Sequence, residues 1–103
     1  MEAGFVFHDD PGTCIMMQRD TIIIELYQLP EPELTGIGNR PDGHIDHIAF
    51  DVPDVDAAFE ALKNAGYNVL EPAPVFLQFW KNGCRFFNIT GPDGERLEFN
   101  QVL

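Results

Sequence analysis

Two glutamates interrupt apolar runs of this chain that have the composition of β-strands. Glu25 lies within the run 22–29, and Glu98 lies within the run 96–103. A carboxylate in the middle of a strand costs free energy unless it is exposed, paired or bound to a cation. Simple exposure to solvent is the plainer interpretation for either residue alone. Because the two glutamates occur in matching sequence contexts, we favour a shared role in cation binding.

A histidine supplies the third candidate for chemistry. His47 lies in the alternating apolar run 43–52, where a single histidine is commonly a core residue. Imidazole and carboxylate groups are, however, the ligands used by Zn, Ni, Fe and Mn sites. We therefore expect Glu25, His47 and Glu98 to bind one divalent metal ion if their strands converge. His44 has the opposite strand parity and His8 lies near a turn, so neither is expected to be a ligand.

The two glutamates belong to an internal repeat. Residues 20–29 recur at 93–102 with an offset of 73, and residues 13–18 align with 83–88 at an offset of 70. Both copies are predicted β-hairpins, with turns at 19–20 and at the Gly-Pro-Asp-Gly segment that starts at Gly91. The repeat predicts that Glu25 and Glu98 occupy equivalent strands of two related halves.

The elements around these hairpins differ between the halves. The first copy gains one strand from the apolar residues 5–7, so it is predicted to have three strands. The second copy is preceded by a strand at 43–52 and by a helix from about residue 54 to 65, which Asp54 caps and Gly66 ends. Residues 75–80 show no clear alternation of apolar and polar residues, and they are predicted as a poorly defined strand or a loop. The second copy is therefore predicted as β-α-β-β-β.

Composition excludes several classes of partner. The chain has 103 residues, 45% of them hydrophobic, which suits a single domain with one core. A formal charge of −11 would repel nucleic acid and anionic membrane surfaces. No apolar run approaches the roughly 20 residues that span a bilayer, and no signal peptide is apparent, so we expect a cytoplasmic protein. Cys14 and Cys84 are too few for a disulfide framework.

A family resemblance rests on three segments of the second copy. Residues 43–52 (GHIDHIAFDV), 56–59 (DAAF) and 91–99 (GPDGERLEF) resemble a module of the glyoxalase/bleomycin resistance/dioxygenase (vicinal oxygen chelate) superfamily. The resemblance implies an α+β fold in which paired βαβββ modules form a cupped mixed β-sheet. Within a single domain 1–103, residues 1–30 would form an incomplete first module of three strands. Residues 31–43 would form a connector, and residues 44–103 a complete second module.

The resemblance also implies a ligand set. The family holds a divalent metal (Zn, Ni, Mn or Fe) with a residue from the first strand and one from the last strand of each module. Carried over to this chain, Glu25, His47 and Glu98 match three of these positions. The fourth would fall before Met1, so we expect weakened metal binding and little isomerase activity from this chain. A longer native form that supplies the fourth ligand is expected to be active. The incomplete first half should also expose apolar surface, which favours a homodimer.

The activity implied by the resemblance is that of lactoylglutathione lyase (glyoxalase I). It isomerises the hemithioacetal formed by methylglyoxal and glutathione. Either Glu25 or Glu98 could act as the catalytic base, and Glu98 is preferred because it belongs to the complete module. Phe76, Phe79 and Trp80 are candidates for the wall of the substrate pocket, with a core role as the alternative. An acyl-CoA epimerase would use similar proton chemistry. A protein that binds or sequesters a small molecule, as bleomycin-resistance members do, is the alternative from another class. A dioxygenase is less favoured, because only one histidine matches a ligand position.

Overall fold

The structure is a computed structural model that describes residues 2–9, 12–40 and 45–103, with side chains from residue 13 onward. The chain divides into two compact units, Met1–His44 and Ile45–Leu103. Strands predominate and helices are few, so the architecture is α+β, as the sequence predicted. None of the helices in the described ranges combines the length and apolar composition needed to cross a membrane.

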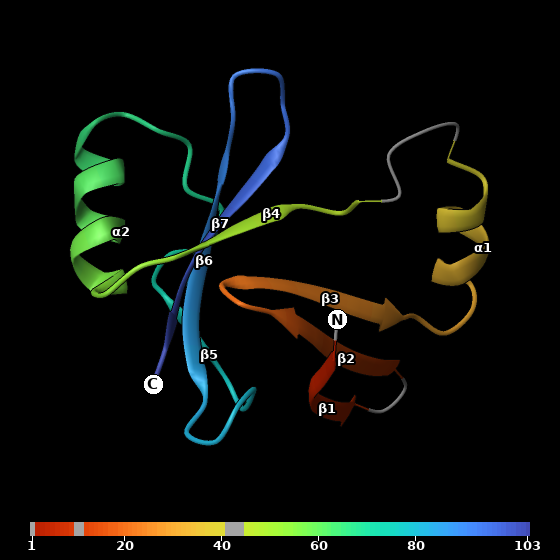
Figure 1. Ribbon diagram of the computed structural model, residues 1–103. Coiled ribbons are helices and arrows are strands. Elements are labelled where there is room, and N and C mark those ends of the chain that lie inside the picture. The colour runs from red at the N-terminus through yellow and green to blue at the C-terminus, as the bar shows by residue number, and fades with distance from the viewer. Residues whose placement is uncertain (1, 10–11, 41–44) are drawn as a thin grey trace. The chain divides into compact units, whose positions relative to one another are not determined.

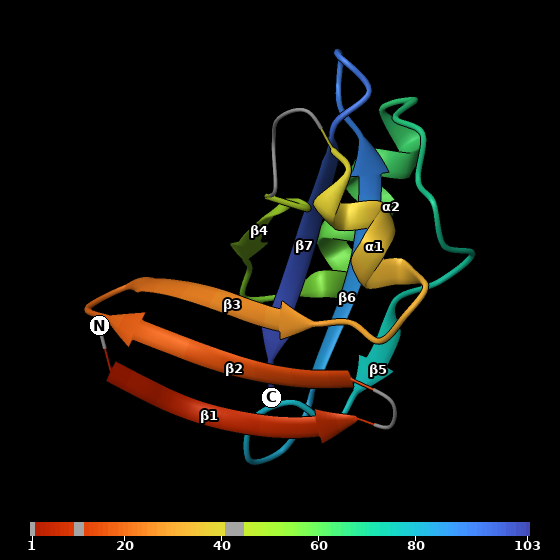
Figure 2. The same cartoon turned by 90° about the vertical axis from the view of Figure 1, so that its right-hand side faces the viewer.

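The first unit contains an antiparallel sheet of three strands in the order β1-β2-β3 (Figure 2). These strands are β1 (Glu2–Asp9), β2 (Gly12–Arg19) and β3 (Ile22–Gln28). The predicted three-stranded half is therefore confirmed. The predicted connector 31–43 contains a short helix, α1 (Glu33–Gly38).

The second unit has the predicted β-α-β-β-β order. Its elements are β4 (Ile48–Asp51), α2 (Val55–Asn64), β5 (Val75–Leu77), β6 (Cys84–Thr90) and β7 (Arg96–Val102). The four strands form one sheet in the order β4-β7-β6-β5, with β4 parallel to β7 and the other neighbours antiparallel. The first strand of this unit therefore lies beside its last strand. Gly43 and His44, with which the predicted strand starts, lie outside the described residues.

Helix α2 begins and ends where the sequence predicted. The Asp54 side chain accepts a hydrogen bond from the Ala57 backbone N–H at 3.1 Å, which satisfies one of the free donors of the first turn. Ala65 caps the C-terminus, and Gly66 follows with a φ of 91°, a conformation that glycine adopts without a steric penalty.

Helix α2 covers one face of the four-stranded sheet (Figure 1). Val55 and Phe59 of the helix pack with Phe87 and Ile89 of β6 to form the buried core. The Phe59 and Phe87 rings meet edge to face with centroids 5.2 Å apart, a favoured aromatic geometry. Phe99 of β7 stacks on Phe87 at 5.3 Å on the same side of the sheet. Since strand side chains alternate between faces, residues 88 and 98 point away from the helix.

Strand pairing aligns the two hairpins and corrects part of the predicted repeat. Glu25 lies opposite Met16 in the first hairpin, and Glu98 lies opposite Asn88 in the second. The two glutamates therefore occupy equivalent last strands, as predicted. The opposing residues, Met16 and Asn88, are 72 apart, so the alignment of residues 13–18 at an offset of 70 was wrong by two positions. The physical reason is that the second turn is only one residue longer than the first, not three (73 − 70): the Gly91 N–H bonds to the Glu95 carbonyl, which leaves a turn of residues 92–94 against 20–21 in the first hairpin.

Candidate functional site

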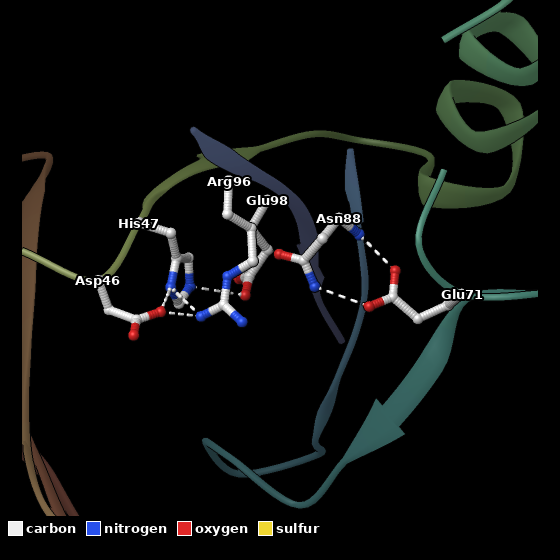
Figure 3. Close-up of polar contacts among 6 residues, drawn as sticks. All are labelled: Asp46, His47, Glu71, Asn88, Arg96 and Glu98. Atoms are coloured by element: carbon white, nitrogen blue, oxygen red, sulfur yellow. Dashed lines mark hydrogen bonds and ion pairs between the residues drawn. The ribbon is translucent and has the colours of Figure 1, made fainter. Parts of the chain in front are cut away.

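His47 and Glu98 meet on the sheet face opposite α2. His47 directly precedes β4, and because β4 runs parallel to β7, this position lies beside the segment of β7 that carries Glu98. The Nε2 atom of His47 is 3.0 Å from Oε1 of Glu98 (Figure 3). The side chains are 24% and 19% exposed, so water only partly screens the pair. The structure thus brings together two of the three predicted ligands.

A second carboxylate contacts the other nitrogen of the same ring. Asp46 Oδ1 lies 2.8 Å from Nδ1 of His47. Carboxylates only accept hydrogen bonds, so an imidazolium that donates from both nitrogens satisfies both neighbours. The hydrogen bond to Glu98 is the main cause that raises the pKa of His47 above its ordinary value of 6.5, and Asp46 adds to it. Burial and the charge of Arg96 act in the opposite direction.

Arg96 completes this polar group at the start of β7. Its guanidinium pairs with Asp46 and lies 2.6 Å from Nδ1 of His47. The arginine competes with the histidine for the same carboxylate oxygen, and its positive charge disfavours the imidazolium. Asp46 therefore orients the ring while Arg96 limits how strongly the ring holds its proton.

Asn88 is a buried polar residue that the sequence reasoning missed. It is 4% exposed and lies opposite Glu98 in the β6–β7 pairing. The Glu71 carboxylate accepts one hydrogen bond from the Asn88 backbone N–H at 2.6 Å and another from Nδ2 at 2.8 Å. An asparagine inside an apolar strand was the available signal, but its partner, 17 residues away, was not readable from any motif.

Glu25, the third predicted ligand, is described within the first unit. The structure defines the two units individually, so a site built from Glu25, His47 and Glu98 together stays a prediction. On β3, Glu25 contacts Cys14, which is fully buried on β2. Burial and the neighbouring Glu25 carboxylate raise the pKa of the Cys14 thiol from 9.0 to about 12. Glu25 also lines an open pocket with Thr13, Ile15, Leu26, Tyr27 and Gln28.

The three aromatic candidates for a pocket wall lie at the β5 end of the second unit. Phe76 of β5 pairs with Arg85, whose guanidinium binds Asp56 of α2. By strand alternation, Phe76 therefore lies on the helix side of the sheet, away from Glu98. Phe79 and Trp80 are half-buried in the turn that follows β5. A shared pocket wall formed by these residues stays a prediction.

The donor set around His47 and Glu98 fits a divalent metal ion. Two ligands in neighbouring positions around one ion, each about 2.0–2.2 Å from it, lie about 3 Å apart. The Nε2–Oε1 distance of 3.0 Å matches this separation. Asp46 on Nδ1 is the outer partner that commonly fixes a metal-binding histidine. Over the described ranges, no group of three or more His, Cys, Asp and Glu residues could hold a metal ion. A third ligand of this ion would therefore be a side chain other than His, Cys, Asp or Glu, or a group that lies outside the second unit.

Comparison with known proteins identifies the class to which this fold and site belong. The family model described as Glyoxalase/Bleomycin resistance protein/Dioxygenase superfamily matches residues 4–99. The chain belongs to this superfamily. No curated protein matches it significantly.

Several solved structures resemble the chain at low identity. SMU.1112c is 20% identical with a TM-score of 0.49, over 96% of this chain and 78% of that one. A glyoxalase family protein from Enterococcus faecalis is 19% identical with a TM-score of 0.48, over 96% of this chain and 76% of that one. TioX from Micromonospora sp. ML1 is 19% identical with a TM-score of 0.44, over 96% and 77%.

Proposed function

We propose that this chain is a metal-dependent lyase or isomerase of the glyoxalase I type that moves a proton next to the carbonyl of a small substrate. The contact between His47 and Glu98 carries the proposal, since it joins an imidazole and a carboxylate at 3.0 Å on the open face of a βαβββ sheet. A divalent ion held by these two residues would polarise a carbonyl oxygen of the substrate. The superfamily membership supports this chemistry.

Different atoms of the site would hold the metal ion and transfer the proton. Asp46 fixes the His47 ring through Nδ1, which directs Nε2 toward Glu98 and the ion. Glu98 directs Oε1 to His47, so its other oxygen is the atom that would accept the substrate proton. Returning that proton to the adjacent carbon, together with transfer of the hydroxyl proton to the former carbonyl oxygen, would complete an isomerisation. General base catalysis of this kind contributes about 10²–10⁴-fold to the rate.

Proton exchange tests the proposal directly. The chain, loaded with Ni²⁺ or Zn²⁺, is mixed in D₂O with the hemithioacetal of methylglyoxal and glutathione, and NMR follows deuterium entry beside the carbonyl. We expect measurable exchange with the wild type, slowed by its incomplete ligand set, and a further loss of at least about 100-fold with Glu98→Gln. Glu60→Gln, on the exposed side of α2, is the matched control and should exchange normally.

Two other outcomes would redirect the assignment. Exchange of an acyl-CoA α-proton without exchange of the hemithioacetal would identify an epimerase. Tight binding of a small molecule without any exchange, in metal-loaded protein, would identify a sequestration protein of the bleomycin-resistance type and refute the enzymatic proposal.

A further inference from the structure

One buried polar atom of the second unit has no hydrogen-bond partner. In the part of the chain that the structure describes, the unpaired buried side-chain atom is Oδ1 of Asn88. An unsatisfied buried carbonyl costs about 1–3 kcal/mol, so such an atom calls for an explanation. A bound ligand that contacts this oxygen would supply one.

The orientation of the Asn88 amide is fixed by its neighbour. Glu71 contacts both the backbone N–H and the Nδ2 group of Asn88, at 2.6 Å and 2.8 Å. A carboxylate accepts hydrogen bonds but cannot donate them, so the amide nitrogen must face Glu71. The amide oxygen must consequently face the other way, toward β7. Glu71 thereby sets the direction in which the oxygen points.

That direction leads to the His47 and Glu98 side chains. Asn88 and Glu98 are directly opposite each other on adjacent strands, and such pairs have Cβ atoms about 4.5–5.5 Å apart on one face. Figure 3 shows the Asn88 oxygen on the side of the amide that faces Glu98 and away from Glu71. The site therefore combines an imidazole nitrogen, a carboxylate and a buried amide oxygen.

The surroundings favour a cation as the missing partner of this oxygen. Glu98 in its carboxylate form cannot donate a hydrogen bond, and the nearest ring nitrogen of His47 is already directed at Glu98. The guanidinium of Arg96 pairs with Asp46. Two oxygen acceptors that face each other repel, and a positive ion between them removes that repulsion.

We propose that Asn88 is a third ligand, through Oδ1, to the divalent ion of the His47–Glu98 site, and that Glu71 is its positioning residue. This inference rests on the proposed function, because it extends the same site. It would also give the metal centre a third ligand, although the described ranges hold no group of three or more His, Cys, Asp and Glu residues for one. Amide carbonyl and carboxylate oxygens suit hard ions such as Mn²⁺, with imidazole as an acceptable third ligand.

Mn²⁺ binding to the full chain tests the proposal without any assay of turnover. The electron paramagnetic resonance signal of free Mn²⁺ falls as the ion binds, which gives a Kd for each variant. We expect Asn88→Leu, which keeps the size of the side chain, to raise the Kd more than about tenfold, and Glu71→Gln to raise it about tenfold. Asn68→Leu is the matched control, because Asn68 is exposed and its side chain donates a hydrogen bond to Thr90 rather than to a residue of the proposed site.

The outcomes separate this inference from the function on which it rests. Wild-type binding that Glu98→Gln abolishes and Asn88→Leu leaves unchanged would overturn the third ligand and retain the metal site. Absence of Mn²⁺ binding by the wild type would overturn the third ligand, and the exchange assay with Ni²⁺ or Zn²⁺ would then decide the proposed function by itself. If circular dichroism shows that Asn88→Leu does not fold, Glu71→Gln decides, because it keeps Asn88 and replaces one of the two acceptor oxygens that orient its amide by a donor. An unchanged Kd in that variant would then refute the proposal.

Discussion

His47 is held between two carboxylates, and this arrangement predicts its protonation behaviour. Glu98 on Nε2 and Asp46 on Nδ1 raise its pKa above 6.5. The ion pair therefore stabilises the fold below pH 6.5, and this stabilisation is lost as the pH rises through the higher folded-state pKa. In metal-free protein, an NMR titration should show His47 titrating above 6.5, and Glu98→Gln should lower its midpoint. His47→Gln assigns the signal; an unshifted midpoint in Glu98→Gln would contradict the contact.

The raised pKa of the Cys14 thiol, about 12, leaves very little thiolate at pH 8. The reactive form would be about 1 part in 10⁴. We expect Cys14 to resist iodoacetamide in the folded protein and to react after denaturation in urea, as measured by peptide mass spectrometry. Glu25→Gln removes one cause of the raised pKa and should speed the reaction. Equal rates in the folded wild type and that variant would argue against the Cys14–Glu25 contact.

The sequence predicted some site residues and missed others for a physical reason. Glu98 and His47 stood out because each places a ligand-type side chain in an apolar run of the sequence. Asn88 also interrupts an apolar strand, but its amide is neutral. It therefore costs less to bury than a carboxylate and did not stand out in the sequence. Its role depends on burial and on Glu71, which reaches it from a loop distant in sequence. Only three-dimensional contacts could show which amide atom lacks a partner.

At the scale of elements, the packing of α2 on β6 determines the stability of the second unit. Phe87 is fully buried between the helix and the sheet and contacts the Phe59 and Phe99 rings. Phe87→Ala should lower the free energy of unfolding by about 3–5 kcal/mol, as measured by urea denaturation. Tyr67→Ala, at a residue that is 52% exposed, is the control and should change it by less than about 0.5 kcal/mol. A loss below about 1 kcal/mol in Phe87→Ala would show that the core tolerates the cavity.

The predicted elements were correct where local signals agreed. Helix α2 had an N-cap, a regular apolar face and a terminal glycine, and its bounds of Val55–Asn64 lie just inside the prediction. Helix α1 was not predicted, because its two glycines and the prolines that precede it give this segment the composition of a loop. It is supported by a contact that composition cannot reveal, the Glu31 carboxylate on the Thr35 backbone N–H at 3.3 Å. Strand β5 has three residues, too few for a clear alternating pattern.

At the scale of the whole molecule, β3 presents a strongly apolar surface. Within the described ranges, β2 is the only strand that pairs with β3, so β3 is an edge strand of its sheet. Four of its large aliphatic side chains are between 44% and 61% exposed: Ile22, Ile23, Ile24 and Leu26. Adjacent exposed aliphatic residues on an open strand edge are typical of a surface that another chain covers.

We therefore expect the protein to form a homodimer that buries β3. Analytical ultracentrifugation at micromolar concentration should show a dimer for the wild type, because burial of these side chains and pairing of the strand edge both favour association. Ile24→Lys places a charge on the edge strand and should shift the protein to a monomer. Ile45→Lys is the matched control: it adds the same charge at a residue that is 79% exposed and lies outside the sheet, so it should leave the dimer intact. A monomeric wild type, or equal dissociation by both variants, would show that β3 is not the interface.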